Sequence, residues 1–327
     1  MSRFTPRGMG WIPDLPDPRD YTLRHETVRR LLKFLKSTQQ QNMPDEIDLR
    51  RDDLGEYFTE PEDQGPINCS ASFAALGLVE YFERRLRGRT FVGSKLFLYK
   101  VTRNLCQKHV EKYDCHSTGD TGADLRTTLK AIATIGVLPE EFWPYNAERF
   151  DEEPSPFAYR VAQPVAGLRY FRLDEPNCNG LETWERIISF IAAGFPIAFG
   201  FVVPTSMTTD AKIPYRGDLE SMRGGQAVVA VGFRKNHFGR GQHALLVRSS
   251  WGRQWGDNGT SWLPAIFVLR LSLNNSTTIE LNRHPKAQRQ STAFGCSEIV
   301  QTVPVHFPTS HFQSHVLPLP SFDGDIS

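Results

Sequence analysis

The sequence predicts an α+β protein in which a mostly helical half is followed by a mostly β half. Up to about residue 150, the apolar residues lie in long segments with helical spacing. After Pro154 the apolar runs become short, rich in β-branched and aromatic residues, and bounded by Gly, Pro or Asn. A chain of 327 residues can bury a substantial core. We therefore expect a helical lobe over residues 46–155 and a β-rich lobe over 156–284.

The first 45 residues are expected to form an arm with one short helix. Residues 1–21 contain four prolines, which favour an extended, non-helical backbone. The stretch HETVRRLLKFLK then predicts a basic amphipathic helix. A short helix of this type more often packs against its own domain than on a membrane surface. Its apolar face would carry Val28, Leu31, Leu32 and Leu35.

Three helices are predicted in the first half. Residues 70–86 are apolar nearly all round, as expected of a helix buried in the middle of a domain. Two more are predicted in SKLFLYKVTRNLC and in ADLRTTLKAIATIG, the second ended by Gly136. In the second half, WERIISFIAAG is the one clear helix. Strands are predicted in PVAGLRYFRL, FPIAFGFVV, GQAVVAVGF and HALLVRSS.

The end of the chain has a different character. Residues 285–327 contain Pro, Ser, Gln and His with little apolar periodicity, which predicts a disordered tail. The whole chain has a net charge of +1, so nucleic acid is not an expected partner. It has no apolar run of 18 residues and no secretory signal, so we expect no membrane span and a cytoplasmic protein.

The cysteines predict free thiols, and no metal or other cofactor is expected. The chain has five cysteines, an odd number, and they are widely spaced. Four potential zinc ligands do fall within eleven residues, but the loop between them is shorter than in usual zinc fingers. We favour an irregular surface loop for this group, which comprises Cys106, His109, Cys115 and His116.

One segment has the composition of a nucleophile site. In DQGPINCSASFAALGLVEYF, Cys69 and Ser70 stand at the start of the predicted buried helix. A thiol at that place has its pKa lowered by the helix dipole, and a His base makes it a strong nucleophile. The side-chain amide of Gln64 could help to stabilise an oxyanion.

Several segments resemble papain-like cysteine peptidases of the bacterial type. DQGPINCSASFA resembles their nucleophile segment, GGQAVVAVGF their histidine strand, and RSSWGRQWGDNGTSWLP their asparagine strand. The segments follow in the family's order from about Gly10 to about Leu271. The resemblance implies a papain-like fold, with a helical lobe, an antiparallel β-rich lobe and a cleft between them.

The resemblance also assigns positions in the cleft. Without a gap, the nucleophile position is occupied by Ser70, the base position by Gln226 and the orienting position by Ser249. Gln64 matches the oxyanion glutamine, and Trp251 matches the tryptophan that shields the family's His–Asn pair.

Two further residues, Gly122 and Cys69, belong to the predicted cleft. Gly122 could match the glycine that lines the family's cleft, or it could simply begin a turn or helix. Cys69, next to the nucleophile position, is expected to be an inert thiol at a helix end.

These substitutions predict a catalytically inactive homologue. Gln226 cannot accept a proton, and Ser249 has no imidazole to orient. Loss of a nucleophile and its base typically costs about 10⁶ in rate. We expect a pseudopeptidase that binds a peptide or protein segment in its cleft, as a scaffold or regulator. The alternatives are a hydrolase that uses a displaced Cys69 or Ser70, and an interaction module that binds through its basic helix or tail.

Overall fold

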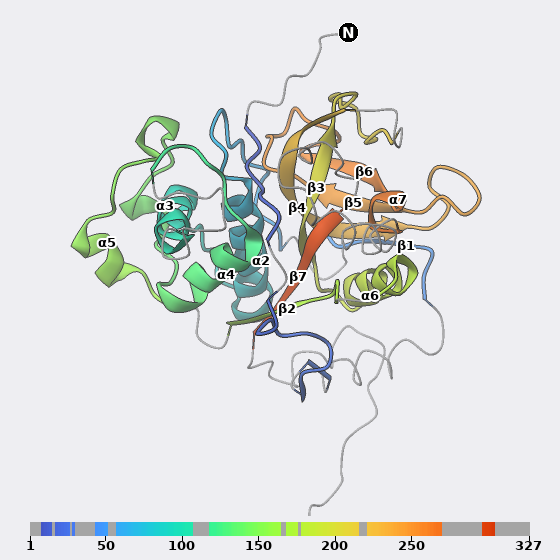
Figure 1. Cartoon of the computed structure of the whole chain (residues 1–327), viewed down its shortest axis with the longest axis horizontal. Coiled ribbons are helices and arrows are strands. Elements are labelled where there is room, and N and C mark those ends of the chain that lie inside the picture. Colours follow the sequence, from blue (N-terminus) through green and yellow to red (C-terminus); the bar gives the residue numbers. More distant parts are fainter. Residues whose placement is uncertain are drawn as a thin grey trace, which may run out of the picture.

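The protein folds into a helical lobe and a β-rich lobe that lie side by side, as a computed structural model of the chain shows (Figure 1). The structure describes residues 8–14, 17–26, 28–29, 43–51, 57–106, 118–164, 168–175, 178–215, 221–269 and 296–304. Within these ranges, no helix has the length and apolar character needed to cross a bilayer. The predicted α+β, two-lobed architecture is confirmed.

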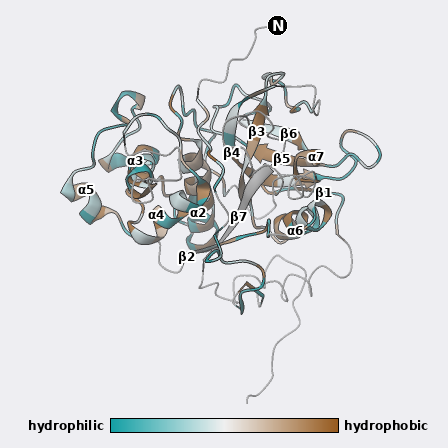
Figure 2. Ribbon diagram, viewed as in Figure 1, coloured by the Kyte–Doolittle hydropathy of each residue, from teal (hydrophilic) through white to brown (hydrophobic). Residues whose placement is uncertain are grey.

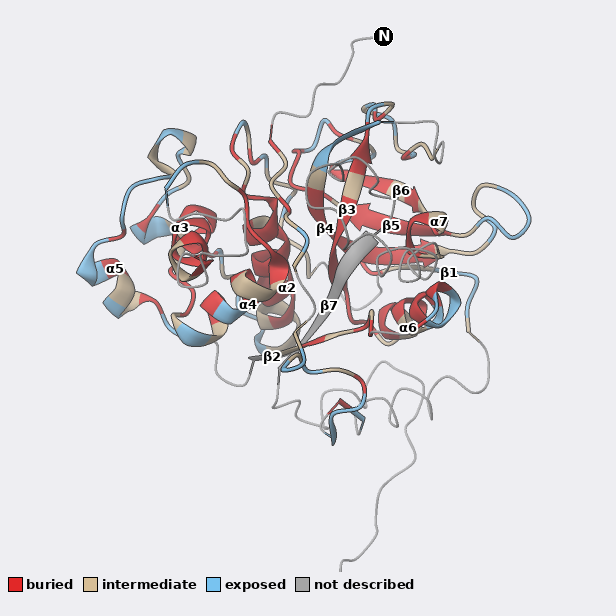
Figure 3. Cartoon of the chain, in the orientation of Figure 1, coloured by how far each residue is buried: buried red, intermediate tan, exposed pale blue. Residues whose placement is uncertain are grey.

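Helix α2 is the centre of the helical lobe and lies against the sheet of the other lobe. It is buried for most of its length, as the sequence predicts (Figure 3). It ends at Gly88, which adopts the left-handed conformation and donates its N–H to the carbonyl of Arg84. Helix α4 begins after Asp124, whose carboxylate accepts the N–H of Thr127 at 2.7 Å. The helices of this lobe are α2 (Ser70–Arg87), α3 (Lys95–Cys106), α4 (Leu125–Thr134), η2 (Glu140–Phe142), η3 (Ala147–Arg149) and α5 (Pro156–Val161).

The β-rich lobe is built on one antiparallel sheet in the order β2-β7-β3-β4-β5-β6, with β1 also paired to β4. Its central strand, β4, has Gln226 opposite Phe201 of β3. Helix α6 covers the face of the sheet that lies away from α2, and its apolar side points inward (Figure 2). The elements are β1 (Glu46–Asp48), β2 (Leu168–Arg172), α6 (Gly180–Ala192), β3 (Ile197–Pro204), β4 (Met222–Arg234), β5 (Ala244–Arg248), β6 (Thr260–Pro264), α7 (Ile266–Leu269) and β7 (Cys296–Pro304).

Alternation along β4 explains how one strand serves two hydrophobic cores. Ala227, Val229 and Val231 pack in the cluster that contains α2. Val228 and Ala230 pack in the cluster that contains α6. Because successive side chains of a strand point to opposite faces, β4 holds the two lobes together through its apolar residues. The polar residue Gln226 immediately precedes this apolar run.

The predicted lobe boundaries need correction. β1 was assigned to the helical lobe, but it pairs with β4 of the sheet. Conversely, α5 packs through Ala158 among the helices, although the β-rich lobe was predicted to start at residue 156. The disordered tail predicted for 285–327 is wrong for β7, whose backbone pairs with both β2 and β3. This pairing is between residues far apart in sequence, so local composition gave no sign of it.

Most of the predicted basic helix lies outside the described residues. Of its apolar face only Val28 is described, and that side chain is buried in the core with α6. The packed arrangement therefore holds for this one residue, while Leu31, Leu32 and Leu35 fall in the undescribed range.

Candidate functional site

The N-terminal arm lies in the seam between the two lobes (the dark blue segment in Figure 1). The carbonyl oxygen of Met9 accepts two hydrogen bonds there. One comes from the backbone N–H of Ser70 at 3.2 Å, and the other from the side-chain amide of Gln64 at 3.0 Å. The Gln64 amide is the donor that the sequence predicted for an oxyanion, and here it binds a neutral carbonyl of the chain itself, together with the N–H of Ser70.

Main-chain hydrogen bonds fix the arm on both sides of the seam. Gly10 accepts the N–H of Ala123 at 2.8 Å, and Ile12 donates its N–H to the carbonyl of Ala123 at 3.2 Å. From the other lobe, the carbonyl of Gly225 accepts the N–H of Trp11 at 3.0 Å. The arm therefore binds as an extended segment between a loop of the helical lobe and the residues of β4 that precede Gln226.

Glycines make room for the arm where it passes closest to other backbone. Gly10 has φ +99°, and a Cβ there would lie 2.0 Å from the carbonyl oxygen of Asn68. The indole of Trp11 lies directly over Gly200, where a Cβ would come within 1.8 Å of the ring. Trp11 itself is 5% exposed. These contacts indicate a seam shaped for the segment that occupies it.

Ser70 is the first residue of α2 and is fully buried. Its backbone N–H belongs to the first turn, which has no partner within the helix, and Met9 supplies one. Its hydroxyl Oγ accepts the N–H of Ala227 on β4 at 3.1 Å. Ser70 rather than Cys69 therefore reaches across the seam toward Gln226. No histidine side chain hydrogen bonds to Ser70 or Gln226 within the described residues.

Gln226 is the centre of a buried network of neutral side chains. Its amide nitrogen lies 3.0 Å from Oε1 of Gln64, 3.3 Å from the hydroxyl of Ser249 and 3.1 Å from that of Ser250. Ser250 in turn donates to Oε1 of Gln64 at 2.5 Å. Gln226 and Ser249 are therefore hydrogen-bonded to each other. None of these four side chains is a general base near neutral pH, because amides and serine hydroxyls do not titrate there.

Cys69 faces the helical lobe. It is the residue before α2, it is fully buried, and its thiol lies 3.2 Å from the hydroxyl of Tyr145. Burial raises the pKa of the Cys69 thiol far above its ordinary value, because the desolvation penalty exceeds the help from Tyr145. A thiol in this environment remains protonated, which supports the expectation that it is inert.

The two remaining predicted cleft residues, Gly122 and Trp251, both touch the arm. Gly122 has φ +85°, and a Cβ there would lie 2.4 Å from the carbonyl oxygen of Gly10. It therefore lines the seam and also adopts a conformation that favours glycine. Trp251 donates its indole N–H to the carbonyl of Gly8 at 2.8 Å. Among the seven predicted cleft residues, only Cys69 points away from the arm and the glutamine network.

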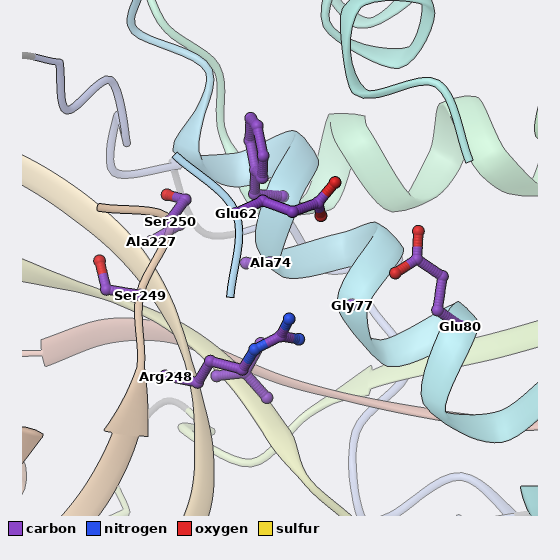
Figure 4. Close-up of a pocket in the computed structure, with 10 residues that line it drawn as sticks. Glu62, Ala74, Gly77, Glu80, Ala227, Arg248, Ser249 and Ser250 are labelled. Atoms are coloured by element: carbon purple, nitrogen blue, oxygen red, sulfur yellow. The ribbon is translucent and has the colours of Figure 1, made fainter. Parts of the chain in front are cut away.

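Behind the glutamine network, charged side chains join the lobes around a small cavity of about 20 Å³ (Figure 4). This volume is enough for about one water molecule. Arg248 extends from the end of β5 toward α2 and donates to the carbonyls of Thr59 and Glu60 at 2.9 Å each. Glu80 of α2 pairs with the buried Nζ of Lys95 at 3.1 Å. The hydrogen bonds of Arg248 link β5 to the segment that precedes α2.

The arm residues Met9 and Trp11 were missed by the sequence analysis, as were Ser250 and Tyr145. The arm was predicted to be extended, but nothing indicated where it lies. The one available signal was the pattern GMGW, in which two glycines flank Met9 and precede an isolated tryptophan. A segment of this kind fits a narrow passage between two backbones.

Three of the four potential zinc ligands, His109, Cys115 and His116, lie outside the described residues. Cys106 is described and buried, with its thiol 3.9 Å from Oδ2 of Asp124. In the part of the chain that the structure describes, no set of three or more acidic, His or Cys side chains could hold a metal. Cys69, Cys106 and Cys178 are free thiols, as expected.

Comparisons with known proteins agree with this architecture. The family model for papain family cysteine proteases matches residues 43–265. An uncharacterized peptidase C1-like protein of Acanthamoeba polyphaga mimivirus is 30% identical over 274 residues, covering 80% of this chain and 83% of that protein.

Solved structures show the same fold. Xylellain, a cysteine protease from Xylella fastidiosa, matches with a TM-score of 0.65 and 23% identity, over 94% of this chain and 99% of that one. Procathepsin L2 from the Tenebrio molitor larval midgut matches with a TM-score of 0.56 and 18% identity, over 79% and 72% of the two chains. With its family model, its viral relative and its two-lobed fold in agreement, the chain belongs to the papain family of cysteine proteases.

Proposed function

We propose that this protein is a catalytically inactive papain-family homologue whose inter-lobe cleft binds an extended peptide segment. In the resting protein that segment is its own residues 8–12. A partner peptide or protein segment would bind by taking over the same main-chain hydrogen bonds, and the protein would act through this exchange as a scaffold or regulator.

The observation that carries the proposal is the environment of the Met9 carbonyl. Two donors, from Ser70 and Gln64, bind this carbonyl, so the part of the site that holds a peptide is intact. The part that would cleave a peptide has Gln226 and Ser249 in a neutral network. A site with binding groups and no proton acceptor supports binding without turnover.

The alternative is an active hydrolase, and the family membership is its main support. A Ser70 nucleophile would need a base, and its hydroxyl is instead hydrogen-bonded to the backbone of Ala227. A Cys69 nucleophile would need a thiolate, which burial disfavours, and the thiol faces Tyr145 rather than Gln226. Both routes therefore require a rearrangement of the start of α2.

Binding in the cleft can be tested by supplying the arm as a separate peptide. The receptor is the full chain carrying Trp11→Ala. This substitution removes the buried indole and so weakens the binding of the chain's own arm in the seam. The ligand is a fluorescent peptide of residues 8–14, GMGWIPD, and binding is followed by fluorescence anisotropy. We expect saturable 1:1 binding.

The matched control is the same peptide with Gly10→Ala. A methyl group there would lie 2.0 Å from the Asn68 carbonyl, so we expect affinity to fall by about 100-fold or more. Equal binding of both peptides, or no binding of either, would contradict a cleft that accepts an extended segment in this way.

A further inference from the structure

The β-rich lobe contains a second concave site that is separate from the seam. It is a cavity of about 620 Å³ between the loop that starts at Lys212, the turn that contains Phe238, and helix α7. The volume is within the range of small-molecule pockets, about 300–1,000 Å³. Neither the arm nor the glutamine network contributes to its lining.

The walls of the cavity are apolar and partly aromatic. Tyr215 and Phe238 face it from two loops, and Ile266 and Leu269 face it from α7. The ring of Tyr215 is held edge-on against Phe267 with the centroids 5.0 Å apart, so its orientation is set by the core. Rigid aromatic and aliphatic walls suit a flat, apolar ligand body.

The rim of the cavity carries a positively charged side chain, that of Lys212. Lys212 is exposed, and its Nζ lies 5.9 Å from the centroid of Phe238. The residues that line the cavity include no Asp or Glu. A ligand with one negative charge would therefore meet an attractive charge at Lys212 and no opposing carboxylate within the lining.

His243 adds a donor whose tautomer is fixed. Its Nδ1 accepts the backbone N–H of Asn236 at 3.1 Å, which leaves the ring proton on Nε2. The imidazole is also stacked on Trp184, with an interplanar angle of 15°. Both contacts hold the ring in place at the edge of the cavity.

We propose that this cavity is a binding site for a small aromatic monoanion. The flat apolar part packs between Tyr215, Phe238 and α7, and the anionic group lies at the rim near Lys212 and His243. The proposal concerns the β-rich lobe alone and does not depend on what happens in the seam.

The test uses 8-anilinonaphthalene-1-sulfonate, an aromatic monoanion, and its neutral analogue N-phenyl-1-naphthylamine. With roughly 20 non-hydrogen atoms, the sulfonate should bind the full chain with a dissociation constant of the order of tens of micromolar. The titration is followed by dye fluorescence and its 1:1 stoichiometry by calorimetry. Lys212→Gln should weaken the sulfonate about 5- to 10-fold and leave the neutral analogue unchanged.

Two variants locate the binding. Ile266→Trp, which fills the cavity from a half-buried position, should abolish binding of both dyes. Phe157→Ser removes a ring that is 61% exposed and pairs with exposed Phe142 elsewhere on the surface. It should have no effect on the 1:1 site. Binding that survives Ile266→Trp, binding lost in Phe157→Ser, or no 1:1 binding would each overturn the proposal.

Discussion

The substitution Gly10→Ala should release the arm from the seam. A methyl group at this position would lie 2.0 Å from the carbonyl oxygen and 2.2 Å from the carbonyl carbon of Asn68, both of them backbone atoms. Gly10 also has φ +99°, which other residues rarely adopt. Because neither clash can be relieved by a side-chain rotation, the arm must move.

The structure allows an estimate of what holds the arm in place. Among the described residues, at least seven hydrogen bonds join residues 8–12 to the two lobes, each contributing about 1 kcal/mol. Burial of Trp11 adds about 2–3 kcal/mol, and ordering five residues costs about 7 kcal/mol. The net docking free energy is about 3 kcal/mol, so the arm should be released in roughly one molecule in a hundred.

Hydrogen exchange measured by mass spectrometry reports this equilibrium. The N–H groups of Ser70 and Ala123 donate to the arm, and Ser70 has no alternative partner in the first turn of α2. Gly10→Ala should therefore remove about 100-fold protection from peptides that contain these amides.

The control is Gly65→Ala, at a residue with φ +62° and no atom within 4 Å of an added Cβ. Gly65→Ala introduces the same kind of backbone strain as Gly10→Ala, about 1 kcal/mol, but no steric clash. The amides of Ser70 and Ala123 should therefore keep their protection from exchange in this variant. Unchanged exchange in Gly10→Ala would refute the arm's role in the seam.

Two further predictions concern the interior around the seam. Glu80→Gln should lower the free energy of unfolding in urea by about 3 kcal/mol, because it removes one carboxylate that neutralises the buried Lys95 ammonium. The control Glu83→Gln removes an exposed ion pair with Arg87 and should change the free energy of unfolding by less than about 0.5 kcal/mol. Similar losses for both variants would contradict this prediction. Burial raises the pKa of the Cys69 thiol, so iodoacetamide at pH 8 should alkylate Cys69 at least about 100-fold more slowly in the folded protein than in urea. The alkylation rate is followed by peptide mass spectrometry. Equal rates in the folded protein and in urea would show a reactive thiol.

Local patterns in the sequence predicted most of the fold. Helix α2 was recognisable because its buried residues surround the helix, and β4 because an apolar run follows two glycines. The positions of Ser70 and Gln226 on either side of the seam follow once these two elements are placed. The side-chain types at those positions can be read directly from the sequence, whereas the hydrogen bonds that join them, including those of Ser250, required the structure.

The location of the arm and the last strand could not be predicted in the same way. The arm is held mainly through its main chain, by groups such as the Met9 carbonyl that every residue carries. β7 enters the sheet between β2 and β3, which are separated from it by about a hundred residues or more. Such long-range pairing has no local pattern beyond a short strand-like run.

Covalent labelling tests most directly whether the site binds a peptide without cleaving it. The full chain with Gly10→Ala, in which the arm no longer blocks the seam, is treated with a peptidyl chloromethyl ketone and its intact mass is measured. A positive control adds Ser70→Cys, Gln226→His and Ser249→Asn to the same chain.

We predict labelling of the control, and none of the Gly10→Ala chain above the rate of an ordinary thiol. Fast 1:1 labelling of the Gly10→Ala chain that disappears with Cys69→Ala or with Ser70→Ala would contradict the account and identify a working nucleophile.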